Sequence, residues 1–353
     1  MFRFTSILFL LLAASAGAQT ISGLSGPFEP GGVLTISGSG FGSKTNPAPV
    51  TWDNMESGDF SEDWQSTGGL SISTESRYPG SNFSGTLNMA GSRGEAGNHA
   101  YFTGNNDILG ERWFAQFWFK LDENFDWGTS SYGGDDQNLA NVKVFRMWNP
   151  GNINENFHVN VHGYSGSGRI QYNTEHVNNP QGGFFGNHWE WTKGVWHCLQ
   201  VEYEESSVGG NDGVLRVWRD GELKVEDTDI MTRENHSQLK RPYIVGMYDA
   251  WNDSDSDRDD VYLDDAYIDN TWARVEVGDD QDYGSCTHRE IQIPTAWSDD
   301  SITVTANPGS FSGGEDLYLF VVEASGQVSD GFLITAGGGN AAPGIPGQPV
   351  RDE

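Results

Sequence analysis

Two segments near the ends of the chain each carry part of a β-sandwich pattern, and neither part is sufficient alone. The first is ISGLSGPFEPGGVLTISGSGFGSK at 21–44, followed by a short expected strand at 49–53. The second, at 289–337, contains SITVT, LYLFVV and GFLIT. Too few strands leave unpaired edges and a bare core face. We therefore expect the two segments to meet in space, with the intervening chain forming a separate unit.

The two segments together resemble the IPT/TIG family of immunoglobulin-like domains. The resemblance rests on LTISGSGFG at 34–42 and on the closing GFLI strand at 331–334. It implies a divided sandwich built from 19–53 and 288–336, a domain that in the family is a spacer or an interaction module. The inserted unit then covers 54–287. The Gly/Pro-rich tail at 337–353 holds too little apolar surface to order itself.

The N-terminus has the pattern of a secretory signal peptide at 1–18. Arg3 supplies a positive end, 7–14 an apolar stretch, and Ala16-Gly17-Ala18 a small-residue cleavage site. No later run approaches the roughly 20 apolar residues of a membrane span. These features predict a secreted protein without membrane insertion. The formal net charge of -30 disfavours nucleic acid and anionic membranes as partners.

The pattern of hydrophobic residues predicts an all-β protein. Short alternating runs are separated by Gly, Asn, Asp and Pro, and no sustained helical period occurs. Strands of the inserted unit are expected at 113–121, 141–148, 157–164, 169–174, 196–204, 214–220, 243–248 and 261–272. Cys198 and Cys286 are the two cysteines. Export permits a disulfide between them, but two buried free thiols fit the sequence equally well.

Three runs of the inserted unit carry a second resemblance. They are GVWHCLQVEYEES at 194–206, DGVLRVWRDGELKVED at 212–227 and VYLDDAYIDN at 261–270. The unit resembles the concanavalin A-like lectin/glucanase superfamily, which includes laminin-G-like modules and jelly-roll polysaccharide lyases. The resemblance implies a jelly-roll sandwich. Asp220 and Gly221 independently predict a tight hairpin turn, since Gly accepts a positive φ at little cost.

One expected strand alternates in a way that predicts a polar sheet face. Phe157, Val159 and Val161 share one side, and the residues between them share the other. With the next strand, that other side holds His158, Asn160, His162, Tyr164, Arg169 and Gln171, opposite Ile170 and Tyr172. Lys143 and Arg146 lie on the preceding strand, whose alternation does not settle which face is polar. Such a face is suited to a sugar-binding groove, because amides, guanidinium groups and imidazoles pair with hydroxyls and carboxylates.

The resemblance to jelly-roll lyases implies roles for these side chains. One group neutralises a uronate carboxylate, a His or Tyr removes the C5 proton, and a Tyr protonates the departing oxygen. His158 or His162 is then the candidate base, and Tyr164 or Tyr172 the candidate acid. The candidate substrate-binding groups are Asn160, Arg169, Gln171, Lys143 and Arg146. A retaining hydrolase of this superfamily needs the E-x-D-x-x-E run, which this chain lacks.

A loop rich in aromatic residues offers a second binding signal. FFGNHWEW at 184–191 contains Phe185, Trp189 and Trp191. Such rings either stack on the apolar faces of sugars or close one end of the sandwich.

Acidic residues suggest a structural calcium ion. Asp253, Asp255 and Asp257 alternate in DSDSDRDD, a spacing that lets a loop wrap calcium with oxygen ligands, although the Gly and Glu of an EF-hand are missing. Glu56, Asp264 and Asp265 could contribute near the closing strand. No organic cofactor is expected.

The sequence thus supports several functional hypotheses. The first is a secreted protein that binds a polysaccharide or cell-surface glycan without cleaving it. The alternative is a polysaccharide lyase that cleaves a uronate-containing glycan by β-elimination. An extracellular adhesion or matrix protein is the third.

Overall fold

The protein is built from antiparallel β-strands. The computed structural model describes residues 19–64, 70–88, 100–101, 110–125, 141–148, 156–164, 167–175, 183–184, 191–234, 241–244, 248–249 and 260–335. Within these ranges the strands are joined by loops and one 3₁₀ turn at Tyr283–Ser285, with no α-helix. The all-β prediction is confirmed. No helix among the described residues is long and apolar enough to cross a membrane. The expected signal peptide and tail lie outside the described ranges.

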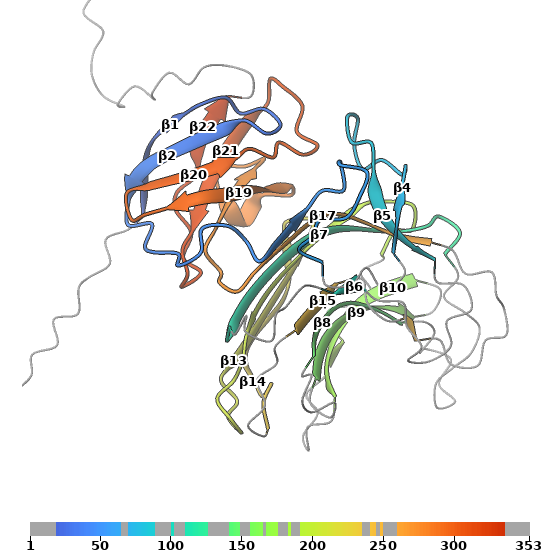
Figure 1. Ribbon diagram of the computed structural model, residues 1–353. Helices are drawn as coiled ribbons and strands as arrows, with labels where there is room; N and C mark the ends of the chain where they lie inside the picture. Colours follow the sequence, from blue (N-terminus) through green and yellow to red (C-terminus); the bar gives the residue numbers. More distant parts are fainter. Residues whose placement is uncertain are drawn as a thin grey trace, which may run out of the picture.

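The two ends of the chain share one sheet, here called the terminal sheet. Its strands, in the order β1-β2-β20-β19-β18-β21-β22, are β1 (Thr20–Ser25), β2 (Val33–Ser39), β20 (Ser301–Thr305), β19 (Arg289–Trp297), β18 (Arg274–Gly278), β21 (Asp316–Val322) and β22 (Phe332–Thr335). β2 pairs with β20 from Val33–Thr305 to Ser37–Ser301. Residues of β2, β20, β18 and β21 line one core, so the sheet curls around it (Figure 1).

A second, outer sheet has the order β14-β13-β12-β7-β17-β5-β4, with β3 also paired to β17. Its strands are β3 (Thr51–Asp53), β4 (Ser71–Ser73), β5 (Ser84–Asn88), β7 (Arg112–Leu121), β12 (His197–Glu204), β13 (Gly213–Arg219), β14 (Glu222–Ile230) and β17 (Asp260–Asp269). β5 covers the first half of one edge of β17, at Asp260–Leu263, and β3 covers the second half, at Ala266–Ile268.

This pairing differs from the expected boundaries at 53/54 and 287/288 in two strands. β3 lies in the outer sheet, because β17 is longer than β5 and its free ladder positions accept a further strand. β18 lies in the terminal sheet, between β19 and β21. The connections between the terminal and outer sheets therefore fall before Thr51 and after Asp269.

A third, inner sheet packs against the outer one. Its order is β11-β10-β9-β8-β15-β6, with β16 also paired to β8, and its strands are β6 (Ala100–Tyr101), β8 (Asn141–Trp148), β9 (Asn156–Tyr164), β10 (Ser167–Glu175), β11 (Gly183–Phe184), β15 (Arg241–Ile244) and β16 (Tyr248–Asp249). Both sheets curve in the same sense, with β8 and β9 beneath the arch of β7 and β17 (Figure 1). The pair forms a jelly-roll-like sandwich.

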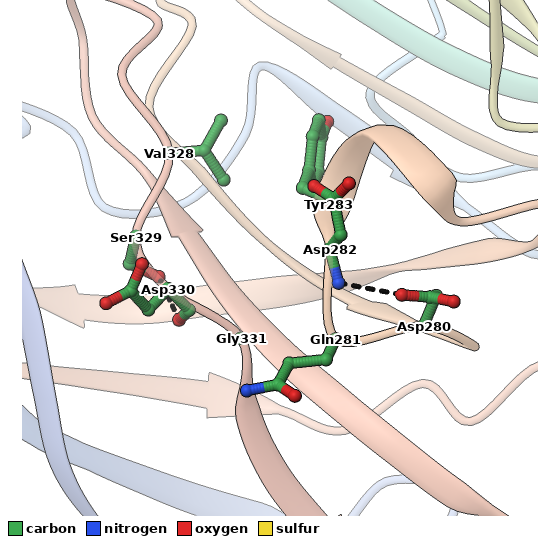
Figure 2. A pocket seen from close by; sticks show the side chains of 8 residues that line it. All are labelled: Asp280, Gln281, Asp282, Tyr283, Val328, Ser329, Asp330 and Gly331. Carbon is green, nitrogen blue, oxygen red and sulfur yellow. Dashed lines mark hydrogen bonds between the residues drawn. The ribbon is translucent and has the colours of Figure 1, made fainter.

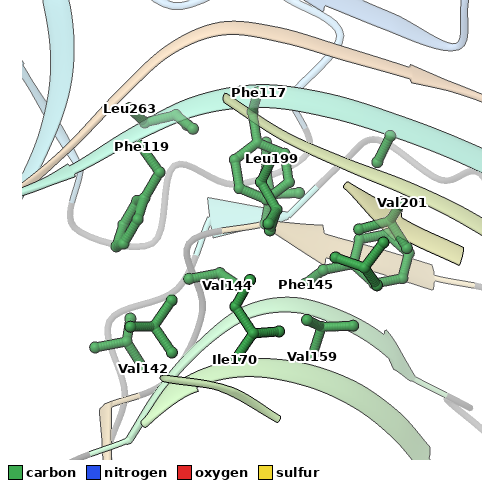
Figure 3. Packing of buried hydrophobic residues seen from close by; sticks show 14 of the residues in the cluster. Phe117, Phe119, Val142, Val144, Phe145, Val159, Ile170, Leu199, Val201 and Leu263 are labelled. Atoms are coloured by element: carbon green, nitrogen blue, oxygen red, sulfur yellow. The ribbon is translucent and has the colours of Figure 1, made fainter. Parts of the chain in front are cut away.

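The core of the sandwich lies between the outer and inner sheets. Alternate residues of β7 and β12, such as Phe117 and Leu199, point toward alternate residues of β9, such as Val159 (Figure 3). All three side chains are fully buried. Because successive side chains of a strand point to opposite faces, this core fixes which residues of the inner sheet face away from it.

The hairpin between β13 and β14 turns at Asp220 and Gly221, which confirms the predicted tight turn. Both residues have positive φ, 50° and 75°, as a type I′ turn requires. A Cβ added to Gly221 would lie 2.1 Å from the Cys286 carbonyl oxygen, so this turn packs directly on the segment that precedes β19. Cys198 and Cys286 are both buried free thiols.

The outer sheet and the terminal sheet meet through a polar group of residues, here called the junction cluster, whose members are buried except for the partly exposed Tyr283. The cluster consists of Gln200, Glu202, Arg274, Glu276, Tyr283 and Arg289. Arg274 donates to Glu202 at 2.9 Å and to Glu276 at 3.0 Å. The Tyr283 hydroxyl donates to Glu276 at 2.6 Å, and Arg289 donates to Gln200 at 2.6 Å. The bonds of Arg274 and Arg289 join β12 to β18 and β19, so the two sheets are linked by buried side chains.

Two further buried cations link the same sheets. Arg77, from the loop before β5, pairs with Asp265 of β17 and, at 2.9 Å, with Glu290 of β19. Lys44, from the connection between β2 and β3, pairs with Asp269 at 2.5 Å. Asp265 sits at a bulge of β17 with φ of 45°, a conformation that Asp and Asn tolerate better than most residues.

We expect the free energy of unfolding of the chain to increase as the pH falls from 7 to 5. Burial raises the pKa of Asp265 and of Asp269 to about 6, against the opposing attraction of Arg77 and Lys44. Both carboxyls then bind a proton more tightly in the folded state than in the unfolded chain. Their contribution is therefore present at low pH and is lost as pH rises through about 6, by about 1 kcal/mol for each group over that range.

Urea unfolding at pH 5, 6 and 7 measures this trend. The pKa of Glu290 is lowered to about 2, because Arg77 and His288 outweigh the effect of burial. The stabilising contribution of ionised Glu290 is therefore still present at pH 5. Asp265→Asn and Asp269→Asn should each flatten the pH dependence. A wild-type stability that is constant or falls toward pH 5 contradicts the prediction.

Candidate active site

The face of the inner sheet that points away from the core is polar, and a β-bulge in β8 builds it. Lys143 pairs with Asn160 and Arg146 pairs with His158, whereas Val144 between them has no partner of its own. Without the bulge, Lys143 and Arg146 would lie on opposite faces, because they are three residues apart. With it, both lie opposite the core.

The register of β8, β9 and β10 arranges this face in three rows. One row runs Arg146, His158, Asn173; the next runs Lys143, Asn160, Gln171; the third runs Asn141, His162, Arg169. Directly paired residues of adjacent strands share a face, with Cβ atoms about 5 Å apart. The predicted residues of β9 and β10 are thus brought together. Tyr164 pairs with Ser167 where the hairpin of these strands closes.

The described side chains of this polar face are Lys143, Arg146, His158, Asn160 and, from β15, Tyr243. The first four are buried, with exposed fractions of 5, 6, 1 and 1 %. Buried charges and amides interact more strongly than they would in water, since little solvent screens them. The Asn160 Oδ1 atom accepts no hydrogen bond within the described part of the chain. For His162, Tyr164, Arg169 and Gln171 the backbone is described and the side chains are not.

Tyr243 is a member of the polar face that sequence reasoning missed. It pairs with Arg146, while its neighbours Pro242 and Ile244 pair with the core residues Met147 and Phe145. The phenol is partly exposed, unlike the other four side chains of the polar face. The expected strand at 243–248 contained this residue, but its face depends on the pairing with β8, which the sequence does not display.

The sequence of the jelly-roll region matches a family model described as polysaccharide lyase over residues 52–269. That range is more than half of the chain. The chain belongs to the polysaccharide lyase family. The match begins in β3 and ends with β17, so it covers the outer and inner sheets and leaves the terminal sheet out.

Among solved structures, this lyase-family chain is similar to an endo-β-1,4-glucuronan lyase from the fungus Trichoderma reesei, at 15% identity over 72% of this chain and 97% of that one, with a TM-score of 0.40. It is also similar to an alginate lyase from Aplysia kurodai (14% identity, 57% and 86% covered, TM-score 0.40) and to alginate lyase vAL-1 from Chlorella virus (10% identity, 63% and 99% covered, TM-score 0.42). A comparison with curated proteins finds no match.

Tyr172 lies on the wrong face of this lyase fold to act as the predicted acid. It is 6% exposed and packs in the core against Phe157, with ring centroids 6.0 Å apart. Its hydroxyl donates to Asp227 of β14 at 2.5 Å, and so ties the inner sheet to the outer one. Burial, followed by the Asp227 carboxylate, raises the pKa of Tyr172 further above its usual range.

Trp191 is likewise a core residue and not part of a sugar-stacking surface. It is 3% exposed and packs against Phe119 at 5.6 Å and His197 at 4.8 Å between ring centroids. This is the second of the two interpretations of the aromatic run, in which the rings close the sandwich. Phe185 and Trp189 lie outside the described residues.

The three carboxylates expected near the closing strand have other partners. Glu56 accepts hydrogen bonds from Ser81 and Asn82 and so fixes that loop. Asp264 and Asp265 face the buried Arg77, which supplies a positive charge to both. Among the described residues, no group of three acidic, His or Cys side chains has the geometry of a metal site. Asp253, Asp255 and Asp257 lie outside the described residues.

A hollow of about 540 Å³ lies on the terminal sheet (Figure 2). Its residues belong to a different sheet from the polar face and are far from it in the sequence. It is lined by Asp280, Gln281, Asp282, Tyr283, Val328, Ser329, Asp330 and Gly331. Three carboxylates at its rim make it unsuited to an anionic sugar. The polar face of the inner sheet is therefore the candidate active site.

Proposed function

We propose that this chain cleaves a uronate-containing polysaccharide by β-elimination at the polar face. The observation that carries the proposal is the placement of Arg146 beside His158 and of Lys143 beside Asn160 in two neighbouring rows of one face, in a domain of the polysaccharide lyase family. Two buried cations on one face are unusual in a chain with a formal net charge of -30. They are suited to a carboxylate, which Arg binds with two parallel hydrogen bonds.

The reaction follows from these groups. A guanidinium or ammonium group that binds the C5 carboxylate stabilises the negative charge that forms when the C5 proton leaves. His158 or His162 accepts that proton. The electron pair of the C5–H bond forms the C4–C5 double bond, and the bond from C4 to the glycosidic oxygen breaks. Asn160, Gln171 and Arg169 are positioned by register to bind hydroxyls or the carboxylate.

The family match favours this lyase function over binding without cleavage. A glycan-binding protein needs the same polar face but no base, and an adhesion protein needs neither. The proposed partner is a polysaccharide, and we propose that the chain is exported to reach it, with the terminal sheet as an IPT/TIG-like support. A calcium ion at Asp253, Asp255 and Asp257 is a separate proposal, and a thermal melt that a chelator leaves unchanged contradicts it.

Incubation of the full chain with glucuronan, alginate and other polyuronates tests the proposed function. We expect ultraviolet absorbance from the unsaturated product with at least one of them. The double variant His158→Ala/His162→Ala should lose this activity, by at least about 10²-fold, because general-base catalysis contributes that much. Binding of these glycans without product would favour the non-catalytic hypothesis. Unchanged cleavage by the double variant would refute the choice of base.

A further inference from the structure

We propose that Tyr243 is a catalytic residue that protonates the departing glycosidic oxygen, an inference that rests on the proposed function. Sheet register places Tyr243, Arg146 and His158 in one row on three adjacent strands, β15, β8 and β9. No other tyrosine whose side chain is described lies on the polar face, since Tyr172 belongs to the core. Of the two acids that the sequence suggested, Tyr172 belongs to the core and Tyr164 lies at the closed end of the β9–β10 hairpin, outside the row of Arg146 and His158. We therefore assign the acid role to Tyr243.

The order of the row is suited to β-elimination. Arg146 occupies the middle, with His158 on one neighbouring strand and Tyr243 on the other. Adjacent strands lie about 4.8 Å apart, so the two outer residues are separated by about 10 Å at the backbone. That spacing places a proton acceptor on one side of the guanidinium and a proton donor on the other.

Access also favours Tyr243. Arg146 and His158 are 6% and 1% exposed, whereas the Tyr243 side chain keeps part of its surface in solvent. A long polymer must enter where the face is open, and its scissile oxygen is carried by a sugar that extends beyond the one held at Arg146. By register the row continues from Tyr243 to Tyr101 of β6, and the second sugar would lie along this part of the sheet.

The step balances as follows. The base takes the C5 proton, the C5–H electron pair becomes the C4–C5 double bond, and the pair of the breaking C4–O bond stays on oxygen. The Tyr243 hydroxyl gives its proton to that oxygen. The phenolate then regains a proton from the protonated base through solvent, which restores both groups.

Tyr243→Phe tests the proposal, with Tyr172→Phe as the matched control from the other face of the same sheet. Tyr243→Phe should lower kcat by about 10²–10⁴-fold with little change in KM, the size of a lost general acid. Tyr172→Phe removes only the bond to Asp227 and should leave kcat within about twofold, since it alters no group on the polar face.

A substrate with fluoride in place of the glycosidic oxygen at C4 identifies the role. Fluoride departs without taking a proton, so Tyr243→Phe should eliminate it at nearly the wild-type rate. If Tyr243→Phe loses its activity on both substrates, Tyr243 acts as the base or as a binding group, and its assignment as the acid is wrong. A wild-type rate for Tyr243→Phe on the natural polymer also overturns the inference but leaves the proposed function intact. Failure of the wild type on every polyuronate is the result that refutes the function itself.

Discussion

Arg146→Ala is expected to lower kcat on a polyuronate by about 10²–10³-fold, the loss seen when one donor to a developing oxyanion is removed. The guanidinium lies between His158 and Tyr243 in the row that crosses the polar face. Abstraction of the C5 proton spreads negative charge onto the carboxylate, so its cation is needed most in the transition state. A group with that role affects kcat more than KM.

Arg146→Lys and Arg216→Ala make this result specific. Lysine keeps the positive charge but not the two parallel donors, so Arg146→Lys should recover only part of the activity. Arg216 lies on β13 of the outer sheet, where it bonds Glu202 at 3.2 Å and Glu226 at 3.0 Å, and its removal should leave kcat unchanged. If Arg146→Ala raises KM alone, Arg146 binds the glycan without stabilising the transition state. Equal thermal melts of the variants exclude unfolding as the cause.

The polar alternation of β9 could be predicted from the sequence, because every second residue between Phe157 and Tyr164 follows one pattern. The same reasoning failed on β8. Its bulge at Val144 shifts the alternation by one residue, and a bulge depends on the partner strand. The sequence therefore named Lys143 and Arg146 as candidate substrate-binding groups but did not settle which face of the sheet they occupy.

Residues whose role depends on contacts between distant strands were the least predictable. Tyr243 acquires its face from β8, and Thr51–Asp53 joins β17 because a ladder position is free there. Trp191 and Tyr172 have side chains that are suited to binding sugars, yet both fill the core. Chemical type indicated what these groups can do, whereas packing decided where they lie.

The surroundings of Asp264 and Asp265 show why the sequence alone could not predict the partner of these two carboxylates. Asp264 and Asp265 look like metal ligands in the sequence, but Arg77 arrives from a loop almost two hundred residues away and neutralises them. A carboxylate pair of this kind needs a positive charge, and the sequence does not tell a guanidinium from a metal ion.

We expect Glu276→Ala to lower the free energy of unfolding by about 3–5 kcal/mol, because it leaves the buried Arg289 without its counterion and removes one of the two counterions of Arg274. Glu276 is fully buried and accepts bonds from Gln200, Arg274 and Tyr283. Burial alone would raise the pKa of Glu276, but Arg274 and Arg289 lower it, so the group is ionised in the folded chain. Urea unfolding that is followed by tryptophan fluorescence measures the loss.

Glu226→Ala is the matched control, since it also removes a carboxylate from an arginine but at an exposed site. The Glu226 side chain is 54% exposed beside Arg216, and a surface pair of this kind contributes at most about 1 kcal/mol. Glu276→Leu separates the charge from the volume. A leucine fills the space but still leaves Arg289 without a carboxylate, so it should remain destabilising. Replacing Glu276 and Arg289 together by apolar residues should recover much of the loss, because Arg274 keeps Glu202. A loss for Glu276→Ala no larger than that for Glu226→Ala would mean that packing, and not the buried charges, holds the terminal sheet on the lyase domain.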